Sequence, residues 1–249
     1  MKKSFLVVLT LALCPAAFSQ PVAAPAAPVT AVVRTNTAIV PAERGDERGR
    51  ARTQEVLKRA KDAPGNYDIA FIGDSITQGW ERSGKSVWDE HFGPRRCINF
   101  GVGGDRTQHV LWRFEQGQLD GIKPKFVVLM IGTNNSNKED NTESDILEGV
   151  ATIVKQIRHR LPETKILLFG IFPRGQTFSA QRGKILQVNQ ALQRQADGKN
   201  VIYLDIGSQL IEKDGSISKE IMPDYLHLSQ QAYDTWAKVI DETIRKAAL

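Results

Sequence analysis

The sequence is poor in cysteine and has no apolar run long enough to cross a membrane. Its 249 residues include two cysteines, Cys14 and Cys97. The most apolar stretch, residues 5–13, is far shorter than the roughly 20 residues that a membrane-spanning helix needs. These shortages argue against a disulfide-rich scaffold and against a multi-span membrane protein.

The short apolar stretch has the surroundings of a secretory signal peptide. Two lysines precede it, and Ala17 and Ser19 place small residues at the −3 and −1 positions of a cleavage site. We therefore expect residues 1–19 to be removed and the protein to be exported, either to the periplasm or outside the cell. Cleavage would also remove Cys14, so Cys97 would remain without a partner for an internal disulfide.

Charge gives no reason to expect nucleic acid or a membrane surface as a partner. The formal net charge is +5, and loss of the expected signal peptide takes two lysines from it. The four histidines include no pair at metal-ligand spacing with a carboxylate or thiolate, so no metal site is expected.

The rest of the chain divides by composition into a linker and one domain. Residues 20–49 are rich in proline, alanine and basic residues, which predicts a linker. Residues 50–249 have no internal repeat and are expected to form a single domain. The overall composition, 41% hydrophobic and 24% charged, is that of a globular protein.

Apolar runs and segments of helical spacing alternate along this domain. The runs are residues 68–73, 97–100, 126–131, 165–170 and 201–205. The clearest helical segments are residues 142–161, 180–196 and 229–246. Near-continuous apolar runs are typical of parallel strands that are buried on both faces. The pattern predicts an α/β fold, a flavodoxin-like three-layer α/β/α sandwich with a five-stranded parallel sheet.

A serine follows the first apolar run, in Gly73-Asp74-Ser75. At a strand-to-helix turn, Ser75 would present its hydroxyl at the edge of the sheet, close to a helix N-terminus that favours negative charge. It could equally be a simple helix N-cap. The pattern is not the Gly-x-Ser-x-Gly elbow of the α/β-hydrolases, because Thr77 replaces the second glycine.

Two further motifs follow the next two runs. Residues 101–105 read Gly-Val-Gly-Gly-Asp, a loop whose backbone N–H groups can approach a ligand. It does not match the dinucleotide-binding pattern, because Arg106 stands at the third glycine position. Asn134, in Gly-Thr-Asn-Asn, carries an amide that can donate to an oxyanion, although such a residue alone is usually part of a turn.

Asp224 and His227 lie three residues apart, just before the last predicted helix. In a turn, this spacing can bring the carboxylate to imidazole Nδ1, which leaves Nε2 to accept a proton from a serine. A histidine of this kind, taken alone, is more often a surface residue beside a helix cap.

In this order, the four motifs resemble those of the SGNH (GDSL-type) hydrolase family. The resemblance extends to its platelet-activating-factor acetylhydrolase catalytic-subunit branch, through the runs at residues 99–105, 109–113, 122–125, 132–135, 173–175 and 226–228. It implies a serine carboxylic-ester hydrolase that needs no metal and no cofactor. The expected signal peptide and linker depart from that branch and point to an exported relative.

The resemblance also implies roles for individual residues. Ser75 would be the nucleophile, His227 the general base and then acid, and Asp224 the residue that orients His227. The oxyanion hole would consist of the backbone N–H groups of Ser75 and Gly104 with the Asn134 side chain. Asp74 is expected to support the turn.

We therefore expect a small-molecule or carbohydrate ester as substrate, with an acetyl or other short acyl group transferred through an acyl-enzyme. The alternatives are a phospholipid or lipid acetylhydrolase and a non-catalytic carbohydrate-binding protein with the same fold. Trp80, Trp88 and Phe178 could line the site, although such aromatic residues are more often in the core, and residues 172–179 could form a specificity wall. Related subunits dimerise, so a homodimer is also an expectation, without a predicted interface.

Overall fold

The computed structural model describes residues 34–137 and 140–247. The expected signal peptide and residues 20–33 of the expected linker lie outside the described residues. The chain separates into two units, Met1–Arg34 and Thr35–Leu249, and the second unit contains all the elements described below.

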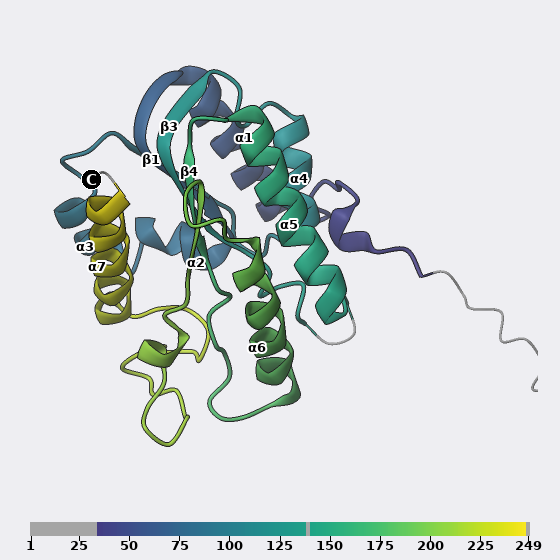
Figure 1. Cartoon of the computed structure of the whole chain (residues 1–249), viewed down its shortest axis with the longest axis vertical. Coiled ribbons are helices and arrows are strands. Elements are labelled where there is room, and N and C mark those ends of the chain that lie inside the picture. Colours follow the sequence, from purple (N-terminus) through teal and green to yellow (C-terminus); the bar gives the residue numbers. More distant parts are fainter. Residues whose placement is uncertain (1–33, 138–139, 248–249) are drawn as a thin grey trace, which may run out of the picture. The chain divides into compact units, whose positions relative to one another are not determined.

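A single five-stranded sheet forms the centre of this unit (Figure 1). All the strand pairs are parallel, in the order β2-β1-β3-β4-β5. The strands are β1 (Gly65–Gly73), β2 (Cys97–Gly101), β3 (Ile122–Met130), β4 (Lys165–Phe169) and β5 (Val201–Leu204). The order is the flavodoxin-like one, and all five predicted strands are present, so the predicted fold class is confirmed.

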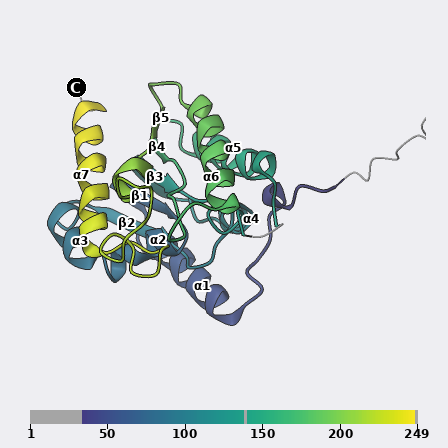
Figure 2. The same ribbon diagram turned by 90° about the horizontal axis from the view of Figure 1, so that it is seen from below.

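Helices cover both faces of the sheet (Figure 2). One face packs against α1 (Glu47–Asp62), α4 (Thr107–Glu115), α5 (Glu143–Arg160) and α6 (Ala180–Leu192). The other packs against α2 (Ser75–Gln78), α3 (Lys85–His91) and α7 (Gln230–Ala247). Single 3-10 turns occur at η1 (Thr37–Ile39), η2 (Gly79–Glu81), η3 (Gln193–Gln195) and η4 (Gly207–Leu210).

The alternation of side chains along β1 explains the two cores. Ala70 and Ile72 point to the core under α1, α4, α5 and α6, whereas Ile69 and Phe71 point to the core under α3 and α7. All four side chains are almost completely buried. A strand with two buried faces needs apolar residues at consecutive positions, which is why its sequence reads as a continuous apolar run.

The folded unit begins before the predicted domain boundary at residue 50. Ala38 is fully buried, and its carbonyl oxygen accepts a hydrogen bond from Thr107 Oγ1 at 2.8 Å. The Arg44 guanidinium donates to the carbonyl oxygen of Gly103 at 2.7 Å. Residues 35–49 therefore belong to the domain. Their composition resembles that of a linker, but long-range contacts hold them in place.

No helix in the described part of the chain is both long enough and apolar enough to cross a membrane.

Candidate active site

The candidate site lies at the carboxyl ends of β1, β2 and β3, where parallel α/β sheets form their sites. Gly73, the last residue of β1, pairs with Gly101 of β2 and with Met130 of β3. The segments that follow these three residues therefore leave the sheet side by side. They carry Ser75, the loop with Gly104, and Asn134, respectively.

Ser75, His227 and Asp224 form a continuous hydrogen-bonded series. His227 Nε2 lies 2.9 Å from Ser75 Oγ, and His227 Nδ1 lies 2.6 Å from Asp224 Oδ2. Asp224 Oδ1 also accepts the backbone N–H groups of Leu226 at 3.1 Å and His227 at 2.7 Å. Partial burial opposes ionisation of Asp224, but the hydrogen bonds from His227 and Leu226 lower its pKa below the ordinary value. An ionised Asp224 holds the ring with Nε2 toward the serine.

A backbone conformation that the motif did not reveal shapes this turn. Tyr225 has a φ of 61°, the one positive φ of a non-glycine residue in the described part of the chain. Its carbonyl oxygen accepts the backbone N–H of Gly175 at 2.8 Å, which helps to hold the conformation. The left-handed residue turns the backbone so that Asp224 faces His227, and such strain is typical of functional sites.

Ser75, Gly104 and Asn134 line the same cavity, and each has an N–H group that could serve as a hydrogen-bond donor. The backbone N–H of Ser75, at the first position of α2, has no acceptor within the helix. Gly104 has a φ of 80°, a conformation that favours glycine. Asn134 lines the same cavity and donates one amide N–H to the carbonyl oxygen of Asp105 at 2.9 Å. Since an amide has two N–H groups, the other can serve an oxyanion.

Replacing Asn134 by alanine is expected to lower kcat for ester hydrolysis by about a hundred- to a thousand-fold, the usual effect of losing one oxyanion donor. Steady-state kinetics on a chromogenic acetate ester would measure the change, with Asn66→Ala as a control at an exposed asparagine of β1. A variant with lower thermal stability but an unchanged kcat would show that Asn134 only supports the loop.

An ionic cluster formed by the buried Asp105 with Arg113 and Arg44 supports the glycine-rich loop. Asp105 is fully buried and accepts hydrogen bonds from Arg113 Nε at 3.1 Å and Arg44 Nη1 at 3.3 Å. Burial raises the pKa of Asp105 to about 6, and the two guanidinium groups limit the rise. Arg44 also lies beside Gly104, where a Cβ would come within 2.7 Å of its Nη1. Asp105 belongs to the Gly-Gly-Asp motif described above, whereas no local pattern in the sequence indicated a role for Arg44.

Asp74 is fully buried beside Ser75 and supports the turn, as expected. Its Oδ1 accepts the backbone N–H of Ile76 at 2.9 Å, and its Oδ2 has no hydrogen-bond partner among the described residues. Burial raises the pKa of Asp74 to about 7, and the neighbouring Asp105 carboxylate contributes to the rise. Asp74 is therefore an acid whose proton is lost in the neutral pH range.

We expect Asp74→Asn to flatten the dependence of stability on pH. The unfolded chain releases the Asp74 proton near the ordinary pKa of 3.8, while the folded protein keeps it up to about 7. The folded state binds more protons between these values, so it loses stability as the pH rises through them. Asparagine has no such proton to lose.

Urea denaturation at pH 5, 6, 7 and 8 would measure this effect. The unfolding free energy of Asp74→Asn minus that of the native protein should be larger at pH 8 than at pH 5. Asp120→Asn, at an exposed aspartate, should keep the native slope. If the unfolding free energy of Asp74→Asn changed with pH as it does in the native protein, Asp74 would not titrate in this range.

The cavity beside Ser75 has a volume of about 570 Å³. None of the three aromatic residues expected to line it does so. Trp80 is fully buried in the core, and Trp88 packs on Phe71 and Phe92. Phe178 is 77% exposed, but it lines a separate apolar groove with Leu186 of α6. Residues 172–179 contribute nothing to the lining of the cavity beside Ser75.

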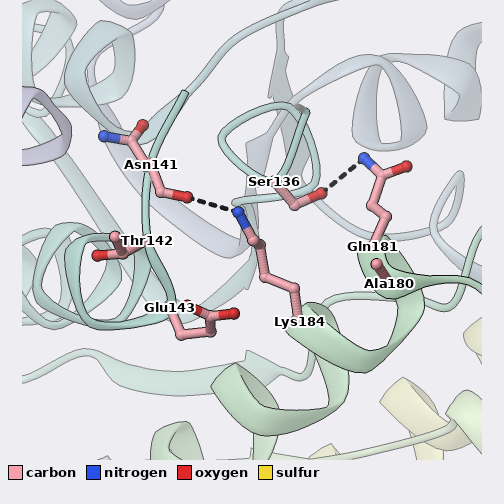
Figure 3. Close-up of a pocket in the computed structure, with 7 residues that line it drawn as sticks. All are labelled: Ser136, Asn141, Thr142, Glu143, Ala180, Gln181 and Lys184. Atoms are coloured by element: carbon pink, nitrogen blue, oxygen red, sulfur yellow. Dashed lines mark hydrogen bonds between the residues drawn. The ribbon is translucent and has the colours of Figure 1, made fainter. Parts of the chain in front are cut away.

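A second hollow of about 440 Å³ lies near the starts of α5 and α6 (Figure 3). Lys184 donates to the carbonyl oxygen of Asn141 at 2.9 Å, and Gln181 donates to Ser136 Oγ at 3.0 Å. The residues that line it include no histidine next to a serine, so it has no arrangement like that at Ser75. Within residues 34–137 and 140–247, no group of three His, Cys, Asp or Glu side chains could hold a metal ion.

Comparisons with known proteins show what this chain is similar to. The sequence model of the GDSL-like lipase/acylhydrolase family matches residues 71–235. The alpha2 subunit of platelet-activating factor acetylhydrolase IB from Rattus norvegicus is 38% identical over 201 residues, which cover 80% of this chain and 85% of the relative.

Two solved structures share the fold at lower identity. A GDSL-like lipase from Bacteroides thetaiotaomicron is 19% identical, with a TM-score of 0.65 over 79% of this chain and 98% of that protein. A catalytic mutant of an acetylxylan esterase from Geobacillus stearothermophilus is 18% identical, with a TM-score of 0.57 over 73% and 94% of the two chains. At these identities, the likeness shows the fold alone.

Proposed function

Because the chain belongs to the GDSL-like lipase/acylhydrolase family, we propose that this esterase hydrolyses short-chain esters through an acyl-enzyme on Ser75. The hydrogen-bonded series from Ser75 through His227 to Asp224, open to a cavity, carries the proposal. A binding protein would need neither an activated serine nor a carboxylate that orients the histidine.

In the proposed reaction, His227 Nε2 takes the proton of Ser75 as Oγ attacks the ester carbonyl carbon. The carbonyl oxygen becomes an oxyanion facing the N–H groups of Ser75 and Gly104 and the amide of Asn134. As the C–O bond to the alcohol breaks, His227 returns the proton to the leaving oxygen. Water then attacks the acyl-enzyme in the same way, which releases the acid and restores Ser75.

The lining of the cavity supports a small acyl group. Among the residues that line it, only Leu226, Leu228 and Tyr233 have largely apolar side chains, so this cavity offers a long acyl chain few apolar side chains. Arginine, serine, glutamine and asparagine make up eight of its 17 lining residues, and such groups suit a hydroxylated substrate. We therefore favour acetyl esters of carbohydrate, which an exported enzyme would meet. Export remains a proposal that rests on residues 1–19.

A phospholipid acetyl ester is the second candidate. It is favoured by the identity of 38% with a subunit of platelet-activating factor acetylhydrolase IB. The expected signal peptide is the feature that speaks against a role inside the cell.

Two ester series separate these proposals. Hydrolysis of p-nitrophenyl acetate, butyrate and octanoate by the full chain should fall as the acyl chain lengthens. Acetate release should then be compared between acetylated xylo-oligosaccharides and a 2-acetyl phospholipid. Faster release from the sugar supports the first candidate, and faster release from the lipid supports the second. Equal rates on acetate and octanoate would contradict a short-chain site.

A further inference from the structure

The cavity beside Ser75 carries an excess of positive charge. Four arginines line it: Arg44, Arg48, Arg52 and Arg82. Besides them, the lining contains a single carboxylate, that of Asp46. A concave surface lined by one sign of charge concentrates the electrostatic potential and attracts ligands of the opposite sign.

Two of the four arginines already form ion pairs and hydrogen bonds within the protein. Arg44 is bound to Asp46, to Asp105 and to the carbonyl oxygen of Gly103. Arg52 is 9% exposed and lies 2.8 Å from Glu81, and its Nε donates to the carbonyl oxygen of Gly101 at 3.1 Å. Their positive charges are balanced by carboxylates, and their donors hold the loops after β2.

The side chains of the other two arginines have no such partners among the described residues. Arg48 lies in the first turn of α1, and Arg82 follows η2; both are exposed. Within the described residues, neither side chain has a hydrogen bond or an ion pair. The first turn of a helix disfavours a cation, so the fold itself gains nothing from the charge of Arg48. Both guanidinium groups remain available to a ligand in the cavity.

We propose that Arg48 and Arg82 form an anion subsite and that the natural substrate is an ester that carries a carboxylate or phosphate group. This inference rests on the function proposed above and narrows its substrate class. A guanidinium group binds either anion through paired N–H donors, which gives both affinity and orientation. The reacting ester would lie at Ser75 while its anionic group lies at the arginine side of the same cavity.

Matched ester pairs test the subsite and identify the source of the anion. An acetylated methyl glucuronoside would be compared with its uncharged glucuronamide, and an acetylated glycerol phosphate with the uncharged acetylated glycerol. In at least one pair, kcat/KM should favour the anionic ester by about tenfold or more, which corresponds to about 1.4 kcal/mol. A preference in the first pair points to an acidic sugar, and one in the second points to a phosphate ester. Added salt should reduce the preference.

The double variant Arg48→Gln/Arg82→Gln should reduce the ratio of anionic to neutral kcat/KM by about tenfold. The matched control is Arg194→Gln/Arg245→Gln, which removes two exposed arginines outside the cavity and should keep the native ratio. Equal preference for both esters in both pairs would overturn the proposal. The proposal would also be overturned if the Arg48→Gln/Arg82→Gln variant kept the native preference for the anionic ester. The same holds if the control variant lost that preference to the same extent.

Binding to the Ser75→Ala protein separates this inference from the proposed function. Calorimetry should show a lower Kd for the anionic ester than for its neutral partner, and the two arginine substitutions should remove the difference. Equal affinities would refute the subsite. If instead hydrolysis of the neutral esters did not depend on Ser75, the proposed acyl-enzyme would fail, and calorimetry would still decide the subsite.

Discussion

Replacing Ser75 by alanine is expected to lower kcat for ester hydrolysis by at least about ten-thousand-fold. His227 Nε2 lies 2.9 Å from Ser75 Oγ, so the substitution removes the group that the histidine is placed to activate. Any residual rate would come from binding and from the oxyanion donors alone. Ser75 is half-buried at the first position of α2, where alanine is well tolerated, so the fold should persist.

Pre-steady-state kinetics and mass spectrometry would provide the decisive measurement. With a p-nitrophenyl ester, native protein stopped early in turnover should carry one acyl group, on the peptide that contains Ser75. The Ser86→Ala variant, at an exposed serine of α3, is the control and should behave like the native protein. Substantial turnover by Ser75→Ala, or an acyl group on another residue, would refute the assignment of the nucleophile.

The largest effect on stability is expected from Arg113→Leu. Arg113 is 1% exposed and donates to Asp105 Oδ2 at 3.1 Å, to the carbonyl oxygen of Phe100 at 3.1 Å and to Gln118 Oε1 at 2.6 Å. Its loss leaves three acceptors without this donor, and one of them is a buried carboxylate. We expect the free energy of unfolding to fall by about 3–5 kcal/mol. For a domain of this size, that corresponds to a Tm lower by about 10 °C.

The pH dependence of this loss tests its cause. The pKa of Asp105 is already raised to about 6 by burial, and removing Arg113 should raise it further. Protonation then relieves the buried charge, so the destabilisation should be smaller at pH 5 than at pH 8. Adding Asp105→Asn to Arg113→Leu should recover part of the stability at pH 8.

Arg194→Leu, at an exposed arginine, should change the stability by less than about 0.5 kcal/mol. A loss for Arg113→Leu that is just as small would show that the cluster does not hold the loop. A large loss that is equal at both pH values would attribute the effect to packing rather than to charge.

Local patterns in the sequence were enough to predict the secondary structure and the fold class. The helix predicted at residues 142–161 is α5, Glu143–Arg160, which begins at a capping box between Thr142 and Asp145. The apolar runs became strands because a doubly covered parallel sheet buries consecutive side chains. Periodicity and caps depend on residues a few positions apart, so a single sequence displays them directly.

The motifs also placed the candidate site residues at the correct edge of the sheet. Parallel strands bring their carboxyl ends together, so Ser75, Gly104 and Asn134 had to lie near one another once the strand order was flavodoxin-like. The contact between Ser75 and His227, which are 152 positions apart, has no local signature. The tertiary structure, in which α7 packs in one core with the sheet, brings the turn that contains His227 to the serine.

The structure corrected the reading of the first residues of the domain and of the aromatic residues. Residues 35–49 look like a linker by composition, yet Arg44 and Arg48 line the cavity beside Ser75. Trp80 could have lined a sugar site, yet it is buried in the core. Composition and residue type describe what a side chain is able to contact. The free energy of packing the whole domain decides what it does contact, because that energy depends on neighbours from distant parts of the chain.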